Sequence, residues 1–286
     1  MPTRTLCTPR TWFITGASRG LGQTLASAVL AHGDRIVVTA RKPEALAPLL
    51  AQGGDRARGH QLDVTDARAT AAVVKAALAD FGGIDVLVNN AGYGLAGAVE
   101  ELDDDQIRTQ FETNVFGALR VTRAFLPHFR AQGHGHILQI SSIAGIAASA
   151  GLGIYNSSKF ALEGFSAALA EEVAPFGIRV TLVEPGPFRT DWAGPSLITP
   201  RHRIEAYAAT AHQRIAQMNG YSGHQPGDPA KAAQVMIEAV ESPNPPLHLP
   251  LGAWAIARMR GQIDQLHRDL AAWETRALDT AFPAGE

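Results

Sequence analysis

The chain has 286 residues, of which 46% are hydrophobic, and its 25 Lys and Arg against 27 Asp and Glu give a net charge of −2. The length suits one α/β domain, the charge balance argues against nucleic acid or an anionic membrane as the main partner, and no apolar run reaches the ~18–20 residues of a membrane-spanning helix. The one cysteine, Cys7, cannot form an internal disulfide and the N-terminus has no apolar signal core, so we expect a cytoplasmic protein.

The first predicted elements are a strand, a glycine-rich turn and a helix. Residues 11–15 (TWFIT) form an apolar strand, GASRGLG follows, and an Ala- and Leu-rich run to Gly33 predicts a helix. The spacing Gly16-x-x-x-Gly20-x-Gly22 differs from the general G-x-G-x-x-G fingerprint, and glycine-rich loops also occur as plain turns. Between a strand and a helix, however, such a turn indicates a phosphate-binding site, because glycines allow close approach and the helix N-terminus offers free N–H groups.

The end of the second strand (35–40, RIVVTA) bears on cofactor choice. An acid at this place would bind the ribose 2′-OH of NAD, but Ala40 is followed by Arg41 and Lys42, and the glycine-rich turn carries Arg19. Cations here suit a 2′-phosphate, so we expect NADP(H) rather than NAD(H). The alternative is that Arg41 and Lys42 form a solvated loop end.

Strands and helices continue to alternate along the chain. We expect a helix over 43–52, a strand over 58–64 that Asp63 closes, a helix over 66–81 and a strand within 83–90. Asp63 could accept a hydrogen bond from an adenine amino group or cap the local turn, and the Asn side chains at 89 and 90 could tie strands together or reach a ligand.

This alternation predicts an α/β fold: a doubly wound, Rossmann-like parallel sheet of seven strands with helices on both faces. Ligands of such sheets bind outside the carboxyl ends of the strands. The glycine-rich turn, Arg41, Asp63, Asn90 and Ser142 all fall at such ends.

A single long helix is expected over 103–130, with the acids Asp103, Asp104 and Asp105 in its first turn, where they suit the helix dipole. Asn114 interrupts its apolar stripe. A polar residue there needs a buried partner or water, and the alternative to a functional role is a helix–helix hydrogen bond.

Three residues that can meet at one point carry the chemistry. Ser142 follows the buried strand HILQI, and Tyr155 and Lys159, four residues apart, share one face of the next helix. Ionising a phenol at neutral pH costs roughly 4 kcal/mol, and a nearby ammonium lowers that cost. With a Ser hydroxyl to hold a carbonyl or alcohol oxygen, this set indicates a general acid/base site.

The C-terminal third combines regular and irregular segments. IRVTLVEPG (178–186) predicts a sixth strand, and an irregular stretch over about 187–228, with a short helix at 203–218, predicts a lid over the substrate. A helix over 228–240 and a seventh strand over 245–252 follow. The helical extension of about 252–280 carries an apolar stripe that we interpret as core or subunit contact, within one domain over 1–286: Trp254, Ile256, Met259, Ile263, Leu266, Leu270 and Trp273.

Together these segments resemble the short-chain dehydrogenase/reductase family from Thr11 to about Gly252. The run Thr15–Gly22 is similar to its cofactor turn, and Asn89-Asn90-Ala91-Gly92 to its sheet-stabilising segment. The resemblance implies NADP when a basic residue replaces the acid, as Arg41 does. It implies a cofactor site of Gly16, Ser18, Arg19, Gly20, Leu21, Gly22, Arg41, Asp63, Val64, Asn90, Ala91, Gly92, Tyr155, Lys159, Pro185, Gly186, Phe188 and Thr190.

The same resemblance assigns catalytic roles. Asn114, Ser142, Tyr155 and Lys159 match the family's tetrad, with its usual thirteen-residue step from Ser to Tyr. Tyr155 would be the general acid/base, Lys159 would lower the pKa of Tyr155 and bind the nicotinamide ribose, Ser142 would hold the substrate oxygen, and Asn114 would support a water for proton relay. The resemblance implies no metal. It implies a homodimer or homotetramer formed through the long helix and the Tyr155 helix.

The leading hypothesis is an NADP-dependent carbonyl reductase or alcohol dehydrogenase for an apolar substrate, since the expected lid carries Trp192, Leu197, Ile198 and Tyr207. Parts of the chain look closest to bacterial members grouped with retinol and hydroxysteroid dehydrogenases. A non-catalytic dinucleotide-binding sensor or scaffold is the alternative, which loss of Tyr155 or Lys159 would indicate. An epimerase or dehydratase is a third reading, but such relatives often have larger substrate domains and a different glycine spacing.

Overall fold

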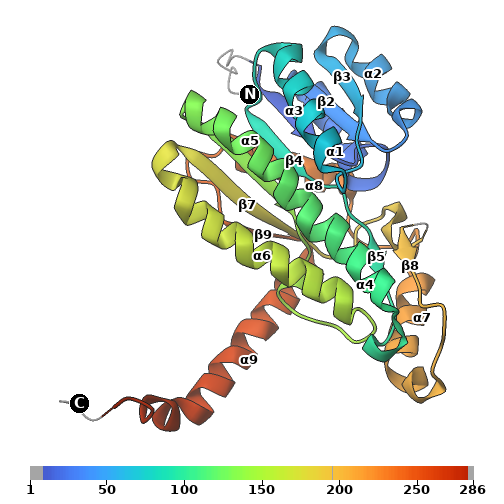
Figure 1. Cartoon of the computed structure of the whole chain (residues 1–286). Helices are drawn as coiled ribbons and strands as arrows, with labels where there is room; N and C mark the ends of the chain where they lie inside the picture. The colour runs from blue at the N-terminus through green and yellow to red at the C-terminus, as the bar shows by residue number, and fades with distance from the viewer. Residues whose placement is uncertain (1–8, 195, 283–286) are drawn as a thin grey trace.

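A parallel sheet of seven strands forms the centre of the molecule, in the order β3-β2-β1-β4-β6-β7-β9 (Figure 1). The computed structural model describes residues 9–194 and 196–282, so Cys7 lies outside the described residues. The predicted α/β fold with seven parallel strands is confirmed. The strands are β1 (Thr11–Ile14), β2 (Arg35–Ala40), β3 (Ala57–Gln61), β4 (Val86–Asn89), β6 (Gly135–Ile140), β7 (Ile178–Pro185) and β9 (His248–Leu251).

Helices cover both faces of the sheet because its central strands are apolar on both sides. In β1, Trp12 and Ile14 enter one core while Phe13 enters the other. The first core is closed by α1 (Gly20–His32), α2 (Ala47–Gly53) and α8 (Pro229–Glu241), and the second by α3 (Ala67–Phe81), α5 (Ala118–Gln132) and α6 (Gly153–Val173). The chain steps outward from β1 to β3 and then returns to place β4 on the other side of β1, which makes the β1–β4 boundary the switch point where such sheets bind ligands.

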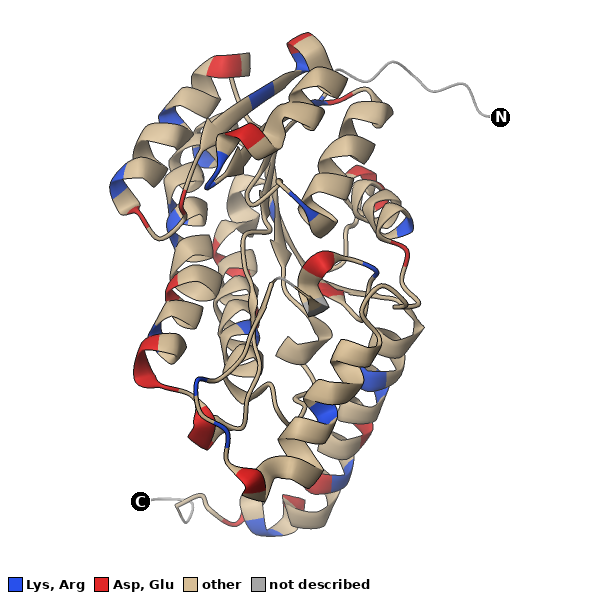
Figure 2. Ribbon diagram, turned by 90° about the vertical axis from the view of Figure 1, so that its right-hand side faces the viewer, with Lys and Arg blue, Asp and Glu red and all other residues tan. Residues whose placement is uncertain are grey.

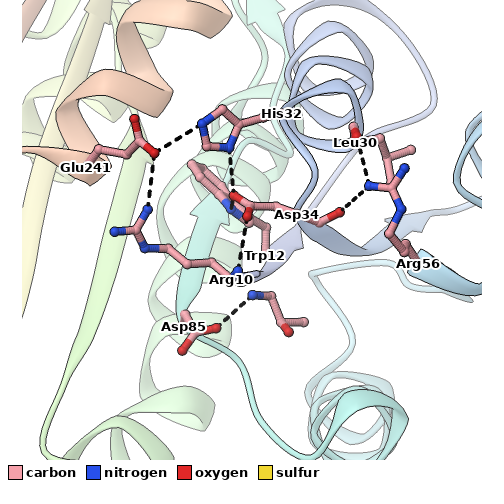
Figure 3. A network of polar contacts seen from close by, with 9 residues as sticks. Arg10, Trp12, Leu30, His32, Asp34, Arg56, Asp85 and Glu241 are labelled. Atoms are coloured by element: carbon pink, nitrogen blue, oxygen red, sulfur yellow. Dashed lines mark hydrogen bonds and ion pairs between the residues drawn. The ribbon is translucent and has the colours of Figure 1, made fainter. Parts of the chain in front are cut away.

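A polar network fixes the amino ends of the strands, at the edge opposite the expected site (Figure 3). The buried carboxylate of Asp34 accepts hydrogen bonds from the main-chain N of Arg10 (3.1 Å) and from Nε1 of Trp12 (3.0 Å). Next to it, His32 contacts Glu241 of α8 through Nε2 at 3.1 Å. The network therefore joins the starts of β1 and β2 to the helix layer on one face.

The long helix expected over 103–130 is helical throughout but not uniform. Between α4 (Asp104–Phe111) and α5, the segment Glu112–Gly117 is π-helical. A π-helical turn holds an extra residue and turns the following side chains relative to the rest of the helix. Asn114, at the centre of this segment, is buried.

Two other sequence boundaries were placed wrongly. The helix expected over 43–52 is a 3₁₀ turn, Pro43–Leu46, followed by α2. The third strand ends at Gln61, so Asp63 lies in the turn beyond it, where its Oδ1 accepts from N (3.0 Å) and Oγ1 (2.8 Å) of Thr65. Of the two interpretations of Asp63, turn capping is observed.

The segment 187–228 is less regular than expected. It contributes β8 (Leu197–Ile198), which pairs with β5 (Gly94–Leu95) in a small two-stranded sheet that the sequence did not reveal. The helix expected over 203–218 is replaced by 3₁₀ Glu205–Tyr207, π-helical Ala208–His212 and α7 (Gln213–Gly220). Short 3₁₀ turns elsewhere in the chain are Gly54–Arg56, Val99–Glu101, Ile143–Gly145, Ala174–Phe176 and Asp191–Ala193.

The C-terminal helix α9 (Ala253–Leu278) extends away from the body (Figure 1). Its apolar stripe is not part of the core, because Leu266, Leu270 and Trp273 are 57%, 60% and 63% exposed, and only Ala255 of the helix is buried. None of the described helices is long and apolar enough to cross a membrane.

Candidate active site

The glycine-rich turn packs directly against the segment after β4. Nδ2 of Asn90 donates to the carbonyl oxygens of Thr15 (2.9 Å) and Gly16 (3.0 Å). Oγ1 of Thr15 accepts from the main-chain N of Asn90 (2.9 Å) and Ala91 (3.0 Å). A Cβ on Gly22 would lie 2.3 Å from Nδ2 of Asn90, and Gly16 has a φ of +65°. Only glycine fits this contact, which brings β1, α1 and β4 together.

The N-terminus of α1 is suited to a phosphate. Its N-cap, Arg19, makes no side-chain capping hydrogen bond, and the first turn holds no acid, so the first N–H groups of the helix have no side-chain acceptor. Thr190 closes this place from the other side: a Cβ on Gly20 would lie 3.7 Å from Cβ of Thr190. The residues present therefore fit a dinucleotide pyrophosphate.

The cations expected to choose the cofactor lie at the same edge. Arg41 and Lys42 directly follow β2, and with Arg19 they are exposed. Burial raises the pKa of Tyr93, and the charge of Arg41 acts to lower it, which places Arg41 near the segment after β4. A 2′-phosphate could reach these side chains without displacing a buried partner.

The other expected cofactor residues lie around the same crevice, but several side chains are engaged in packing. Leu21 packs against the first core, and Val64 is buried against Gly117. Phe188 contacts Gly227, while the main-chain N of Gly186 donates to the carbonyl of Leu251 (3.0 Å). We expect these residues to offer main-chain atoms or side-chain edges to a ligand. Of the remaining residues of the set, Pro185 ends β7, Ser18 is partly exposed and Gly92 is exposed.

Ser142, Tyr155 and Lys159 meet at the end of β6. Ser142 caps a 3₁₀ turn, its Oγ accepting from the main-chain N of Ala144 (3.1 Å). Tyr155 and Lys159 are buried on one face of α6, with Nζ of Lys159 5.8 Å from the centre of the Tyr155 ring. Nζ donates to the carbonyl of Ile140 (2.8 Å), the last residue of β6.

Burial controls the ionisation of both groups. It raises the pKa of Tyr155 to about 12, against a hydrogen bond with Ser142 that acts to lower it. Burial lowers the pKa of Lys159 to about 8, against the charge of Glu163, which raises it. Burial therefore favours the neutral phenol of Tyr155, and the lowering of its pKa by Lys159 stays a prediction.

Asn114 braces the site through its side chain. Its Oδ1 accepts from the main-chain N of Tyr93 (3.1 Å), and its Nδ2 donates to the carbonyl of Tyr93 (3.0 Å) and to Oγ of Ser158 (3.3 Å). Because Ser158 lies on α6, next to Lys159, the helix–helix hydrogen bond that the sequence left open is present. Support of a water by Asn114 stays a prediction.

Three residues behind Lys159 were missed by the sequence analysis. Nδ1 of His248 lies 2.7 Å from Oε1 of Glu184 and 3.7 Å from Oε2 of Glu163, and the three side chains offer ligand atoms within 4.8 Å of one another. Burial raises the pKa of Glu163 to about 7 and that of Glu184 to about 8. A proton retained on this pair removes the cost of two adjacent buried carboxylates. Two signals in the sequence could have pointed to them: Glu163 stands four residues after Lys159, and Glu184 is an acid inside an apolar strand.

Apolar side chains pack around Tyr155. The ring centres of Trp192 and Tyr155 lie 5.1 Å apart. Ala96, Ala144 and Leu152 form one cluster with Tyr155, against which further side chains of the segment 187–228 pack: Trp192, Leu197, Ile215 and Met218. Of the aromatic and aliphatic residues expected to line a lid, Ile198 is exposed, and Tyr207 donates to Glu100 (2.5 Å) instead.

A buried hydrogen bond between Glu101 and His212 anchors the segment 187–228, and the sequence did not predict it. Oε1 of Glu101 accepts from Nε2 of His212 (2.6 Å) and from the main-chain N of Ile204 (2.7 Å). Nε of Arg203 donates to Nδ1 of His212 (3.0 Å), so the proton of the imidazole lies on Nε2. Burial acts to raise the pKa of Glu101, but hydrogen bonds from Ile204, His212 and Ala98 hold it below its ordinary value.

Figure 2 marks the Lys and Arg positions and the Asp and Glu positions on the ribbon, and both kinds are scattered over the helices and loops. The residues of the expected site, in contrast, are gathered at one edge of the sheet.

Comparisons with known proteins agree with this geometry. The family model for short chain dehydrogenase matches residues 10–199. Oxidoreductase BOA17 of Botryotinia fuckeliana is 41% identical over 94% of this chain and 98% of its own length. A 3-ketodihydrosphingosine reductase of Bacteroides thetaiotaomicron is 34% identical over 85% of this chain and 88% of its own.

Solved structures show the same likeness. A short-chain dehydrogenase from Streptomyces avermitilis has a TM-score of 0.91 and 41% identity, over 96% of this chain and 99% of that one. An actinorhodin polyketide ketoreductase solved with NADPH has a TM-score of 0.71 and 28% identity, over 85% and 95%. A Burkholderia phymatum member of 24% identity, solved with NAD, has a TM-score of 0.80 over 91% and 95% and shows the fold.

We expect Gly22→Ala to destabilise the protein, because its Cβ would lie 2.3 Å from Nδ2 of Asn90 and 2.9 Å from the carbonyl oxygen of Gly16. Overpacking of this kind typically costs about 1–3 kcal/mol. Thermal unfolding is the measurement. Gly164→Ala, also in a helix but with no atom within 4 Å of the new Cβ, is the matched control and should keep or gain stability. Equal melting temperatures for the two variants would contradict the close contact.

The buried glutamates predict how stability depends on pH. Because the pKa values of Glu163 and Glu184 in the folded protein lie above the ordinary value of 4.5, the folded chain binds more protons than the unfolded chain between about pH 5 and 8. This contribution to stability is present at low pH and lost as the pH rises through that window.

Glu184→Gln should therefore flatten the decline and raise the melting temperature at pH 8 relative to the parent. The control is Glu171→Gln, an exposed residue of the same helix as Glu163, which should leave the profile unchanged. Parallel profiles for the parent and Glu184→Gln would show that Glu184 is already ionised near pH 5.

Proposed function

The chain belongs to the short-chain dehydrogenase family of dinucleotide-binding oxidoreductases. We propose that it transfers a hydride between NADP(H) and the carbonyl or secondary alcohol of an apolar substrate. The observation that carries this proposal is the meeting of Ser142, Tyr155 and Lys159 at the carboxyl end of β6, beside the glycine-rich turn. The alternative of a non-catalytic sensor or scaffold is less well supported, because both Tyr155 and Lys159 are present and buried.

NADP(H), when bound, supplies or accepts the hydride. The residues of the chain do the rest: the N–H groups at the start of α1 hold the phosphates, and Arg19 and Arg41 neutralise a 2′-phosphate. Basic side chains in place of an acid after β2 support NADP(H) over NAD(H). The neighbours solved with NADPH and with NAD show that the fold accepts both.

In the reductive direction, Ser142 holds the substrate oxygen and Tyr155 donates a proton to it. A pKa of about 12 keeps the phenol protonated until charge develops on that oxygen. Lys159 lies close enough to stabilise the tyrosinate that forms, and it can hold ribose hydroxyls. Asn114 keeps α6 aligned through Ser158 and supports a water that returns a proton to the site.

The substrate is an apolar carbonyl compound or alcohol. Apolar side chains pack beside Tyr155, namely those of Trp192, Leu197, Ile215 and Met218. They support an apolar substrate, as does the similarity to a 3-ketodihydrosphingosine reductase. The segment 187–228 acts as the lid of a single domain, and Glu101 ties the middle of this segment to the body through Ile204 and His212. A cytoplasmic location and the absence of a resident metal stay predictions from the sequence.

Self-association through the long helix and α6 is part of the proposal. Phe116 and Phe160 are 47% and 45% exposed on these elements. A shallow hollow beside Phe116, lined by Ile107 and Phe111 of α4, offers a complementary apolar surface. Both features support a homodimer or homotetramer.

Tyr155→Phe should lower kcat by about 10²–10⁴-fold, the usual contribution of a general acid. The ring remains against Trp192, so NADPH affinity, followed by nicotinamide fluorescence, should stay nearly constant. Turnover would be measured with NADPH and a panel of apolar ketones. Retained turnover would remove Tyr155 from the proposed chemistry.

Arg41→Asp should move cofactor preference from NADP towards NAD, because an acid accepts the ribose 2′-OH and repels the 2′-phosphate. The measurement is the ratio of kcat/KM for NADPH to that for NADH, which should fall by at least about tenfold, or 1.4 kcal/mol. Arg130→Asp, an exposed site at the far end of α5, is the control for charge alone. An unchanged ratio in Arg41→Asp would refute the 2′-phosphate assignment.

A further inference from the structure

Helix α9 is attached to the body only at its beginning. Ala255 is buried, and Nη2 of Arg258 donates to the carbonyls of Ala147 (3.3 Å) and Ala148 (2.7 Å). Further along, the described side-chain hydrogen bonds stay within the helix, as from Gln265 to Asp269 (2.8 Å). At 1.5 Å per residue, the stretch from Arg258 to Leu278 extends about 30 Å into the solvent (Figure 1).

The exposed part of α9 carries a regular apolar stripe. Its members are separated alternately by three and four residues: Ile256, Met259, Ile263, Leu266, Leu270, Trp273 and Ala277. Exposure rises along it, from 45% at Ile263 to 63% at Trp273. A strict repeat of 3.5 residues is the signature of a coiled-coil seam, narrower than the stripe of a helix that packs on a globular core.

A helix of this kind is not stable alone in water. Isolated helices draw little stability from propensity, and Gly261, near the start of the exposed stretch, costs about 1 kcal/mol more. Leu266, Leu270 and Trp273 also present more apolar surface than a monomer normally leaves in solvent. The sequence of α9 therefore indicates a partner that covers the stripe.

We propose that α9 pairs, antiparallel, with α9 of a second copy of this chain. In one register the two stripes form matched layers. Trp273 lies opposite Ile263 of the partner subunit, Leu266 opposite Leu270 of the partner subunit, and Met259 opposite Ala277 of the partner subunit. Each large side chain except the central leucines thus meets a smaller one, as interdigitating cores require, and a two-fold axis repeats every contact.

The flanking charges distinguish the two possible orientations. In the antiparallel register Arg260 lies beside Glu274 of the partner subunit, twice by symmetry, while Asp269 faces Asp269 of the partner subunit across the axis. A parallel pair would put Asp269 beside Glu274 of the partner subunit, twice, and would leave Arg260 beside an alanine. The antiparallel pair thus has two contacts between opposite charges and one between like charges. The parallel pair has two contacts between like charges and none between opposite charges, so the antiparallel pair is favoured.

The length of the helix fits the same register. Leu278, at the end of α9, falls opposite Arg258 of the partner subunit, the residue with which that helix leaves its body. The seam therefore spans the whole exposed stretch, and neither helix extends past the point where its partner is attached.

A lipid surface fits α9 less well. Helices that lie on membranes carry a basic polar face, whereas the four arginines of α9 are nearly matched by three acids: Arg258, Arg260, Arg268 and Arg276 against Asp264, Asp269 and Glu274. A mixed polar face of this kind is suited to water and to ion pairs with a second helix.

The first experiment compares the native mass of the full chain with that of Leu266→Glu by light scattering after size exclusion. Leu266 is 57% exposed in the single chain, so the variant should fold, which far-UV circular dichroism and turnover would check. We expect the native mass to fall by half. A parent dimer would become a monomer, and a parent tetramer would become the dimer that α4, α5 and α6 hold together. Ala271→Glu, on the opposite side of α9, is the matched control and should keep the parent mass. An unchanged mass for Leu266→Glu would overturn the proposal.

The second experiment tests orientation by disulfide formation, in a Cys7→Ser background. A mixture of Leu266→Cys and Leu270→Cys proteins should form a cross-linked heterodimer, since these positions share a layer in the antiparallel pair. Leu266→Cys alone should stay reduced, and a disulfide-linked homodimer of it would overturn the antiparallel arrangement. A parent chain that is monomeric and sediments with phosphatidylserine vesicles would overturn self-association in favour of a lipid surface. None of these results depends on the proposed oxidoreductase activity.

Discussion

The burial of one ammonium group, that of Lys159, is the constraint on which the site depends. A buried cation is costly unless it has partners. Here the carbonyl of Ile140, at the end of β6, accepts a hydrogen bond from Nζ, and Glu163 lies one turn further along α6. Because the strand end and the helix must both approach Nζ, the position of Lys159 fixes α6 against the sheet. Tyr155 is held in place by the same helix.

The same cluster links the site to stability. Glu163 supports the charge of Lys159, but it lies beside Glu184 of β7, and both carboxyls have pKa values raised towards neutrality by burial. Shifted pKa values of this kind are common at functional sites and also occur in structural networks of ionisable groups. At the opposite edge, Asp34 joins the starts of β1 and β2 through its hydrogen bonds with Arg10 and Trp12.

Much of this could be predicted from the sequence, because parallel strands and their helices follow apolar periodicity, and the residues proposed for acid/base chemistry stand at fixed spacings. Asn114, Ser142, Tyr155 and Lys159 are indeed brought to one edge of the sheet. The π-helical turn at Glu112–Gly117 could not be predicted, since it depends on how Asn114 reaches Tyr93. The pairs Glu101–His212 and Glu184–His248 join residues distant in sequence, and no local pattern reveals them. The stripe of α9 was recognised, but core and subunit contact look alike in a sequence.

Titration of the purified protein with NADPH and with NADH, followed by nicotinamide fluorescence, tests the central claim most directly. The claim is that the edge formed by the glycine-rich turn, Arg41 and the Tyr155 helix holds NADP(H) beside a general acid. We expect saturable binding of NADPH and at least about tenfold weaker binding of NADH, a difference of 1.4 kcal/mol. Preference for NADH would show that Arg41 and Lys42 are a solvated loop end. Binding of neither would contradict the enzyme assignment itself.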